Sequence, residues 1–309
     1  MIDKVAIIGL GLIGGSLAMA LTQRSFANEI VGIDINQEII DKALELKAID
    51  RGTTSLIDGV KNASLVVLCV PVSKIFELAE KIKPYLKEGC IVTDVGSTKA
   101  DIVTRLEDIF FPQCSFVGGH PMAGSEQHGI EAADKYLLEN AYYIVTPTDK
   151  TSAAALAVVG RMIEAAGGKE VTIGPKEHDQ IVAFISHLPH IVAVSLVNSL
   201  TGLSDITRDP LALAAGGFRD STRIANSDPL LWRDICFSNR EQVLSSLASF
   251  KKALTELEDS IRANDQERFV TSFAQAKQKR EKIPAKAKGL LPGIYQVIVT
   301  VPDRPGMIG

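Results

Sequence analysis

The chain has 309 residues, of which 46% are hydrophobic and 23% are charged, and its formal net charge at pH 7 is −4. This length and composition fit a soluble globular protein of about two domains. A net-acidic chain lacks the basic face that nucleic-acid binding requires, so we expect no nucleic-acid partner. We also expect no membrane association and no signal peptide, because the apolar runs look too short to span a bilayer.

The N-terminal segment combines an apolar strand with a glycine motif. Residues 5–14 read Val-Ala-Ile-Ile-Gly-Leu-Gly-Leu-Ile-Gly, so the strand runs directly into G-x-G-x-x-G. In this motif the first glycine allows a tight turn, the second lets the backbone approach a pyrophosphate, and the third lets the helix pack on the strand. The segment therefore predicts a dinucleotide site at a helix N-terminus. Its expected members are Gly9, Gly11, Leu12, Ile13 and Gly14.

The second strand, expected over residues 29–35, carries Asp34 twenty residues after the last glycine of the motif. A carboxylate at this point hydrogen-bonds a ribose 2′-hydroxyl and repels a 2′-phosphate. Residues 35–38 supply no Lys or Arg that could neutralise such a phosphate. NAD is therefore favoured over NADP, although Asp34 could equally help to cap the helix that begins near Asn36.

Short apolar runs alternate with helical stretches as far as about residue 176. Most of these runs lack polar alternation, which is typical of a parallel sheet buried on both faces. We therefore predict an α/β Rossmann-type doubly wound sheet over residues 1–176, with ligands outside the carboxyl ends of its strands. Val70 and Pro71, at the end of the third run, are assigned to the cofactor site. The expected strands are 5–10, 30–35, 65–71, 91–95, 116–117, 141–145 and 170–173.

Two segments that follow later strands could carry chemistry. Residues 94–99 read Asp-Val-Gly-Ser-Thr-Lys, and residues 118–126 read Gly-Gly-His-Pro-Met-Ala-Gly-Ser-Glu. An alcohol dehydrogenase needs a base, because the hydroxyl proton must leave when the hydride leaves. His120, in a loop between Gly-Gly and Pro, has a side chain whose ordinary pKa near 6.5 suits this task. We assign His120 as the catalytic base and Ser97 as the residue that orients it or the nicotinamide.

The second half of the chain contains helical patterns only, and we predict an all-α domain over residues 177–285. Residues 177–200 form a long apolar helix that Pro189 should kink. A further helix is expected from Asp265 to about residue 282. Between them, apolar residues recur at intervals of four and three, a spacing that packs helix on helix. This seam could fill the domain core or join two copies of the chain; its members are Val243, Leu247, Phe250, Leu254, Leu257 and Ile261.

Polar side chains gather at two places in this half. Residues 186–190 place two imidazoles and a hydroxyl around the proline, and residues 216–225 bring Arg219 and Arg223 close to a Gly-Gly break. Arg is the side chain best shaped for bidentate capture of a carboxylate. From spacing alone, a surface Arg and a satisfied core His are equally good interpretations. The four cysteines form no C-x-x-C pair, so we expect no disulfide, no metal site and a reducing, cytoplasmic location.

Together these blocks resemble the prephenate dehydrogenase family, which includes the arogenate dehydrogenases of tyrosine biosynthesis. The strings Gly-Gly-His-Pro-Met-Ala-Gly-Ser-Glu and Phe-Arg-Asp-Ser-Thr-Arg-Ile-Ala are far more specific than the glycine motif. The resemblance implies an NAD-dependent oxidative decarboxylation of prephenate to 4-hydroxyphenylpyruvate by a homodimer joined through the helical domain. It makes His120 the base and Arg223 a clamp for a substrate carboxylate. It further implies contacts from Ser186 and His190 to the side-chain end of the substrate, gating acids Glu126 and Asp220, and a pocket wall at Trp232.

Alternatives remain at three points. Arogenate carries an ammonium where prephenate carries a ketone, and residues 186–190 offer no acid to bind it, so prephenate is favoured. A β-hydroxyacid dehydrogenase would need a catalytic lysine on the helical domain, and a sensor that binds NAD without turnover would not need His120, Ser97 and Arg223 to converge. Residues 286–309 are interpreted as a linker and the start of an ACT-like regulatory domain, since residues 293–306 resemble the opening strand and turn of that domain, too short a stretch to fold unaided.

Overall fold

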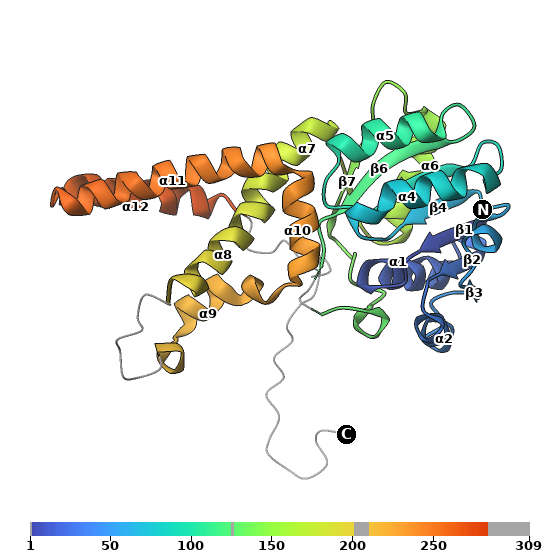
Figure 1. Ribbon diagram of the computed structural model, residues 1–309, viewed down its shortest axis with the longest axis horizontal. Helices are drawn as coiled ribbons and strands as arrows, with labels where there is room; N and C mark the ends of the chain where they lie inside the picture. The colour runs from blue at the N-terminus through green and yellow to red at the C-terminus, as the bar shows by residue number, and fades with distance from the viewer. Residues whose placement is uncertain (1, 125–126, 201–209, 284–309) are drawn as a thin grey trace, which may run out of the picture.

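An eight-stranded sheet with helices on both faces forms the first half of the molecule (Figure 1). A computed structural model of the chain describes residues 2–124, 127–200 and 210–283. Within these residues the strand order is β3-β2-β1-β4-β5-β6-β7-β8, the pattern of a doubly wound sheet. The strands are β1 Ile2–Ile8, β2 Ala27–Ile33, β3 Arg51–Thr53, β4 Leu65–Leu68, β5 Ile91–Asp94, β6 Ser115–Pro121, β7 Tyr142–Thr146 and β8 Lys169–Thr172.

Alternate residues of the central strand supply two separate hydrophobic clusters. Val5 and Ile7 of β1 belong to one cluster, and Ala6 and Ile8 belong to the other. The first cluster includes apolar residues of α1, α2 and α6, and the second includes those of α3, α4 and α5. The sheet is therefore buried on both faces, as its apolar strands predicted. These helices are α1 Leu12–Gln23, α2 Gln37–Glu45, α3 Leu56–Val60, α4 Val72–Ile82, α5 Ala100–Phe110 and α6 Ala153–Ala165, with single 3-10 turns at Lys83–Tyr85 and Ile130–Ala132.

The sheet departs from the prediction in three respects. The short edge strand β3 was missed, because three residues carry no periodicity. The pair β6–β7 is antiparallel, whereas every other pair is parallel. The sixth strand also continues through His120 and Pro121, which were expected in a loop, because β7 supplies a ladder partner for these residues. The expected loop therefore begins later than the sequence indicated.

The helical half begins with a continuous helical stretch over Pro175–Asn198. The expected break lies earlier than Pro189, in a π-helical turn at Ala183–His187. Pro189 lies in the first turn of α8, directly after this π-helical turn, and because it has no N–H it cannot donate to a carbonyl of that preceding turn. The helices are α7 Pro175–Val182, α8 Leu188–Asn198, α9 Gly216–Thr222, α10 Pro229–Ser238, α11 Arg240–Arg262 and α12 Gln266–Glu281, with 3-10 turns at Pro210–Leu213 and Arg223–Asn226.

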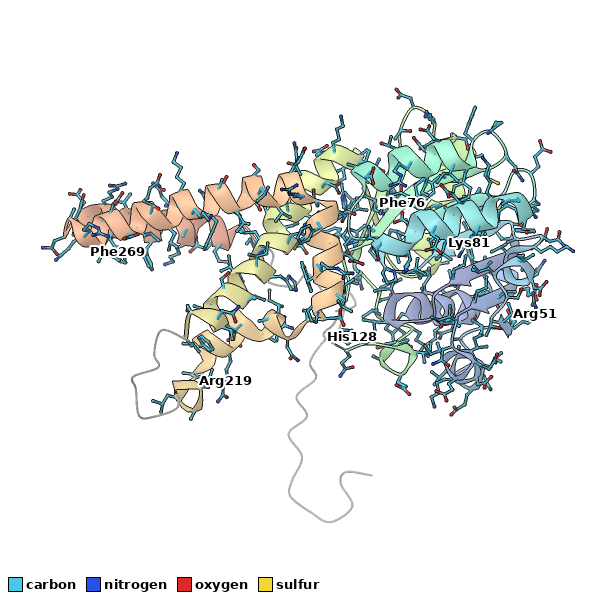
Figure 2. All side chains as sticks on the ribbon, in the orientation of Figure 1. Arg51, Phe76, Lys81, His128, Arg219 and Phe269 are labelled. Carbon is cyan, nitrogen blue, oxygen red and sulfur yellow. The ribbon has the colours of Figure 1, made fainter. Side chains whose placement is uncertain are left out.

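Helix α10 packs against α4, and α7 packs against α5, so the two halves are in contact. Helices α11 and α12 form a hairpin that projects away from the sheet, with Phe269 near its tip (Figures 1 and 2). The predicted seam is buried only at its start: Val243 is buried, whereas Leu254 is 54% exposed and Ile261 is 67% exposed. Within the residues that the structure describes, most of the seam therefore does not fill a core. The predicted tail 286–309 lies outside the described residues.

The stretch Pro175–Asn198 is long and apolar enough to cross a membrane by length and composition, with a mean hydropathy of 1.7. The expectation that no segment reaches this length is wrong in that respect, because α7, the π turn and α8 join into one helical stretch. Only 22% of its most apolar window is buried. However, it also carries buried polar side chains, His178, Asp179 and His187, that contact the rest of the protein.

Candidate active site

The glycine motif forms a turn whose three glycines meet different surroundings. Gly9 has φ +93°, and a Cβ there would lie 2.3 Å from the carbonyl oxygen of Cys69. A Cβ on Gly14 would lie 1.9 Å from the carbonyl oxygen of Gly9. A Cβ on Gly11, by contrast, would meet no atom within 4 Å. The turn is thus closed on the protein side and open at Gly11, where a pyrophosphate would approach.

The start of α1 suits an anion. Gly11 is the N-cap residue, no side chain caps the helix, and its first turn contains no acidic residue. Leu12 and Ile13, both half-buried, form that first turn. The N–H groups at a helix N-terminus carry partial positive charge, which favours phosphate. The turn and helix together fit the predicted dinucleotide.

Asp34 follows β2 directly and braces the glycine turn. Its Oδ2 accepts a hydrogen bond from the backbone N–H of Leu10 at 2.9 Å, and its Oδ1 accepts one from the N–H of Asn36 at 3.1 Å. Asn36 in turn caps α2. The cap of α2 is therefore Asn36, and Asp34 holds the backbone of Leu10 and Asn36 instead of capping the helix itself. Val70 and Pro71 follow β4 on the neighbouring side, with a Val70 methyl 3.1 Å from where a Gly9 Cβ would lie.

His120 is buried on β6, one strand beyond the loop that carries Ser97. Its Nδ1 lies 2.8 Å from Nε2 of His178, and Nδ1 of His178 lies 2.8 Å from Oδ1 of Asp179. Both of these partners belong to α7, the first helix of the second half. The structure therefore joins the candidate base to the helical half through a buried chain of two imidazoles and a carboxylate.

A buried ion pair lies next to this row of two imidazoles and a carboxylate. The ammonium of Lys99 pairs with Oδ2 of Asp94, and both side chains are completely buried. Asp94 also accepts hydrogen bonds from the backbone N–H groups of Gly96 at 2.8 Å and Gly119 at 3.1 Å. Because Gly119 precedes His120, this carboxylate fixes the backbone on both sides of the candidate site.

Burial sets the protonation of the imidazoles. It lowers the pKa of His120 well below the ordinary value of 6.5, and the nearby His178, Lys99 and His187 lower this pKa further. Burial also lowers the pKa of His178, although the hydrogen bond to Asp179 opposes the shift. Both rings are therefore neutral at pH 7, and a neutral His120 can accept a proton.

A second cluster forms around α8 and α10. The ring of His190 stacks on Trp232 with centroids 3.6 Å apart, and its Nδ1 lies 3.0 Å from the carbonyl oxygen of Ser186. His187 meets the same Trp232 edge-on at 6.1 Å. Its Nε2 is buried and has no hydrogen-bond partner in the described part of the chain. A buried polar atom without a hydrogen-bond partner costs free energy.

The remaining predicted residues are Ser97, Arg223, Asp220 and Glu126. Ser97 is half-buried beside Thr98, whose hydroxyl oxygen accepts a hydrogen bond from the Ser238 hydroxyl of α10 at 3.1 Å. Arg223 and Asp220 are exposed on the segment that packs against α8; Figure 2 shows the nearby Arg219 on α9, remote from the sheet. Glu126 lies outside the described residues.

Sequence reasoning missed His178, Asp179 and Lys99. Lys99 stood inside the highlighted segment 94–99, but lysine is rarely buried, so nothing marked it as an ion-pair partner. His178 and Asp179 lie in a polar stretch that reads as a solvated helix start. Their adjacency was the one available signal, and only the packing of α7 on α5 gives it meaning.

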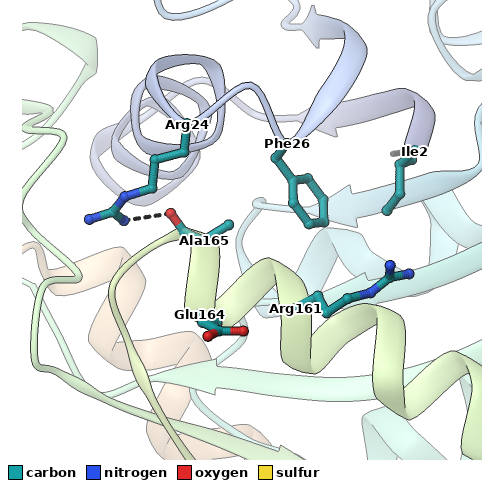
Figure 3. Close-up of a pocket in the computed structure, with 6 residues that line it drawn as sticks. All are labelled: Ile2, Arg24, Phe26, Arg161, Glu164 and Ala165. Atoms are coloured by element: carbon teal, nitrogen blue, oxygen red, sulfur yellow. Dashed lines mark hydrogen bonds between the residues drawn. The ribbon is translucent and has the colours of Figure 1, made fainter.

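One surface pocket lies away from this site. It has a volume of about 400 Å³ and is lined by Ile2, Arg24, Phe26, Arg161, Glu164 and Ala165 (Figure 3). Arg24 donates a hydrogen bond to the carbonyl oxygen of Ala165 at 2.5 Å. Because Ile2 begins β1, the pocket lies at the amino ends of the strands, opposite the edge that carries His120. Among the described residues, no group of three or more His, Cys, Asp or Glu side chains could hold a metal ion.

Comparison with known proteins gives consistent matches. The family model described as "Prephenate dehydrogenase, nucleotide-binding domain" matches residues 17–172, and "Prephenate dehydrogenase, dimerization domain" matches residues 174–275. A prephenate dehydrogenase of Bacillus subtilis is 38% identical over 99% of this chain and 83% of its own length.

Comparison with solved structures gives matches to the same family. A prephenate dehydrogenase from Aquifex aeolicus, in complex with hydroxyphenyl propionate and NAD⁺, superposes with a TM-score of 0.87 at 40% identity, covering 92% of this chain and 99% of the other. An arogenate dehydrogenase from Synechocystis gives a TM-score of 0.77 at 32% identity, covering 90% and 99%.

Proposed function

The chain belongs to the prephenate dehydrogenase family, and on that premise we propose that it catalyses the NAD-dependent oxidative decarboxylation of prephenate to 4-hydroxyphenylpyruvate in tyrosine biosynthesis. The observation that carries this proposal is the buried His120 at the carboxyl end of β6, on the same edge of the sheet as the glycine turn after β1. A dehydrogenase needs a base next to its dinucleotide, and the two features lie at the carboxyl edge of one sheet.

Residues of the glycine turn would hold NAD⁺, which supplies the hydride acceptor when bound. Gly11 and the start of α1 would receive the pyrophosphate, and Asp34 would bind the adenosine ribose. His120 accepts the proton of the substrate's ring hydroxyl. As the ring carboxylate leaves as carbon dioxide, aromatisation of the ring drives the reaction forward. Ser97 would join His120 to the nicotinamide.

The substrate carries two carboxylates, so a net-acidic protein must supply local positive charge or hydrogen-bond donors. We assign Arg223 as a carboxylate clamp, with Ser186 and His190 at the side-chain end of the substrate and Trp232 as a wall. The stacking of His190 on Trp232 supports this assignment. Asp220 and Glu126 would act as gating acids.

Arogenate is the second candidate substrate, since relatives named arogenate dehydrogenase and cyclohexadienyl dehydrogenase also match. The ammonium of arogenate would need an acidic partner beside its side-chain end. Residues 186–190 contain imidazoles and a hydroxyl but no acid, which supports the keto acid.

We also place the protein in the cytoplasm as a homodimer, with an NAD-binding domain at 1–176 and a helical domain at 177–285. The two family matches meet between residues 172 and 174, which supports this division, and the second is described as a dimerization domain. Exposed apolar residues on α8 and α11 support an interface there. Cys69, Cys90, Cys114 and Cys236 are all free thiols, in keeping with a reducing compartment.

The test is NADH formation followed by absorbance, with prephenate and arogenate each offered alongside NAD⁺ and NADP⁺. Turnover of prephenate with NAD⁺, at a kcat/KM well above the other three combinations, is the expected result. Preference for arogenate would overturn the substrate assignment. Binding of NAD⁺ without turnover of either substrate would overturn the proposed enzymatic activity and would indicate a sensor that binds NAD.

A further inference from the structure

We propose that His178 and Asp179 are positioning residues that fix the tautomer of His120, so that its Nε2 is the unprotonated nitrogen. This inference rests on the proposed function, in which His120 is the base. Neither residue is needed to contact substrate or cofactor; they would act through the His120 ring. The argument follows the hydrogen bonds from the carboxylate outward.

Asp179 lies where a carboxylate is best kept as an anion. Its Oδ1 accepts a hydrogen bond from the backbone N–H of Lys99 at 2.7 Å, and its Oδ2 accepts one from the N–H of Ala100 at 2.9 Å. These N–H groups belong to the N-cap residue of α5 and to its first residue, so the helix dipole also favours negative charge there. A carboxylate held in this way can only accept, so Nδ1 of His178 must donate to it at 2.8 Å.

The protonation of the other three ring nitrogens follows from this hydrogen bond. A neutral His178 that donates from Nδ1 carries a lone pair on Nε2. That lone pair lies 2.8 Å from Nδ1 of His120, which must therefore carry a proton and donate it. A neutral His120 protonated on Nδ1 has its lone pair on Nε2. The second nitrogen is thereby committed to accept a proton from a substrate hydroxyl.

Charged groups around the chain of imidazoles are compatible with this arrangement. His178 faces Asp179 on its own helix, and Lys99 and Asp94 from the sheet side. His120 faces His178, Lys99 and His187. The charges of Lys99 and Asp94 are paired with each other, which leaves Asp179 to stabilise the imidazolium that forms when His120 takes up a proton. In serine proteases, likewise, a buried carboxylate orients the catalytic imidazole and holds its tautomer.

The direct test is a nitrogen NMR measurement that needs neither substrate nor cofactor. The chain has five histidines, so labelling with ¹⁵N-histidine gives few signals, and loss of one set in His120→Asn assigns the base. We expect His120 in the native protein to be protonated on Nδ1 and unprotonated on Nε2. In Asp179→Asn one amide oxygen remains to accept from the N–H groups of Lys99, Ala100 and His178, so the single tautomer of His120 should be lost and both ring nitrogens should show partial protonation. Protonation of Nε2 in the native enzyme at pH 7 would overturn the proposal.

Kinetics give an independent readout. Asp179→Asn should lower kcat by about 10²- to 10⁴-fold with KM and the NAD⁺ dissociation constant little changed, because the residue sets a tautomer and binds no ligand. His178→Gln keeps an oxygen that can accept from His120 Nδ1 and should retain more kcat than His178→Leu, which offers none. Equal losses in the Gln and Leu variants would contradict the proposal.

Ser238→Ala is the matched control for a purely structural link between the two halves. It removes the hydrogen bond between Ser238 and Thr98, which joins α10 to the segment before α5 without touching the imidazoles. We expect the tautomer and kcat to be unchanged in this variant. If His120 has the expected tautomer but prephenate is not turned over, the proposed function fails while the positioning by His178 and Asp179 stands.

Discussion

His120 and Arg223 carry different parts of the proposed reaction, and steady-state kinetics can separate them. His120→Asn removes the base and should lower kcat by about 10²- to 10⁴-fold with a small change in KM. Arg223→Ala removes a charged contact to a carboxylate, which should raise KM by at least about tenfold while kcat changes less. The opposite assignment of effects would contradict both roles.

The glycines of the turn provide a second pair of variants at the residue scale. Gly14→Ala places a Cβ 1.9 Å from a backbone oxygen that cannot move freely, so the free energy of unfolding should fall by about 3 kcal/mol or more. Gly11→Ala meets no protein atom within 4 Å, so the melting temperature should stay close to that of the native protein.

The same Gly11 methyl group would occupy the space in front of α1, where the pyrophosphate is expected. The NAD⁺ dissociation constant should therefore rise about tenfold or more, a loss of about 1.4 kcal/mol. Calorimetry for stability and fluorescence titration for NAD⁺ check the two effects separately. Native affinity for NAD⁺ in Gly11→Ala would place the dinucleotide elsewhere.

At the scale of elements, the stretch Pro175–Asn198 carries apolar side chains that the described part of the chain leaves exposed. Val194 on α8 is 44% exposed, and Leu196 and Phe184 are exposed on the same stretch. A membrane or a second copy could cover such a surface. The buried polar groups of α7, which join this stretch to the sheet domain, favour the second copy. The family description of this region as a dimerization domain supports the same conclusion.

Val194→Glu tests this interface. Glu is a good helix former, so the helix should remain intact while a charge enters the apolar contact. The dimer dissociation constant should rise by at least about 30-fold, or about 2 kcal/mol. Light scattering after size-exclusion chromatography measures the mass. Ile57→Glu is the control, since Ile57 is similarly exposed, at 42%, on α3 of the sheet domain. Equal dimer stability in the two variants would exclude α8 from the interface.

For the whole molecule, the buried histidines predict a loss of stability in acid. Burial lowers the pKa of His187 to about 4, below its ordinary value of 6.5. The unfolded chain therefore takes up a proton between pH 6.5 and 4 that the folded protein does not, and the free energy of unfolding falls as the pH falls. His187 alone should account for about 3 kcal/mol of this loss at pH 4.

Thermal unfolding of the native protein and His187→Gln across pH 7 to 4 checks this expectation. The variant should lose less stability over this interval, because it lacks the titrating ring. His128→Gln is the control for replacing a histidine at an exposed position. Parallel curves for all three proteins would mean that His187 does not remain neutral in the folded state.

Much of this architecture could be inferred from local patterns in the sequence. Short apolar runs identified seven of the eight strands in the described residues, and most of these runs lack polar alternation because a strand buried on both faces of a sheet must be apolar throughout. The glycine motif and Asp34 indicated the cofactor site, because a tight turn, a close backbone approach and a strand-end carboxylate each require particular residues at fixed spacing. These requirements involve residues close together in the sequence, so patterns in the sequence can predict them.

The tertiary structure decided what depends on contacts between distant segments. The antiparallel β7 gives His120 its place on a strand, although the two residues paired there are 24 positions apart. Lys99 and Asp179, 80 positions apart, are brought together by the packing of α7 on α5. A buried lysine, a tautomer fixed through His178 and the exposed seam of α11 all follow from which surfaces meet. Local sequence patterns do not specify those contacts, because they are selected by the free energy of the whole packed molecule.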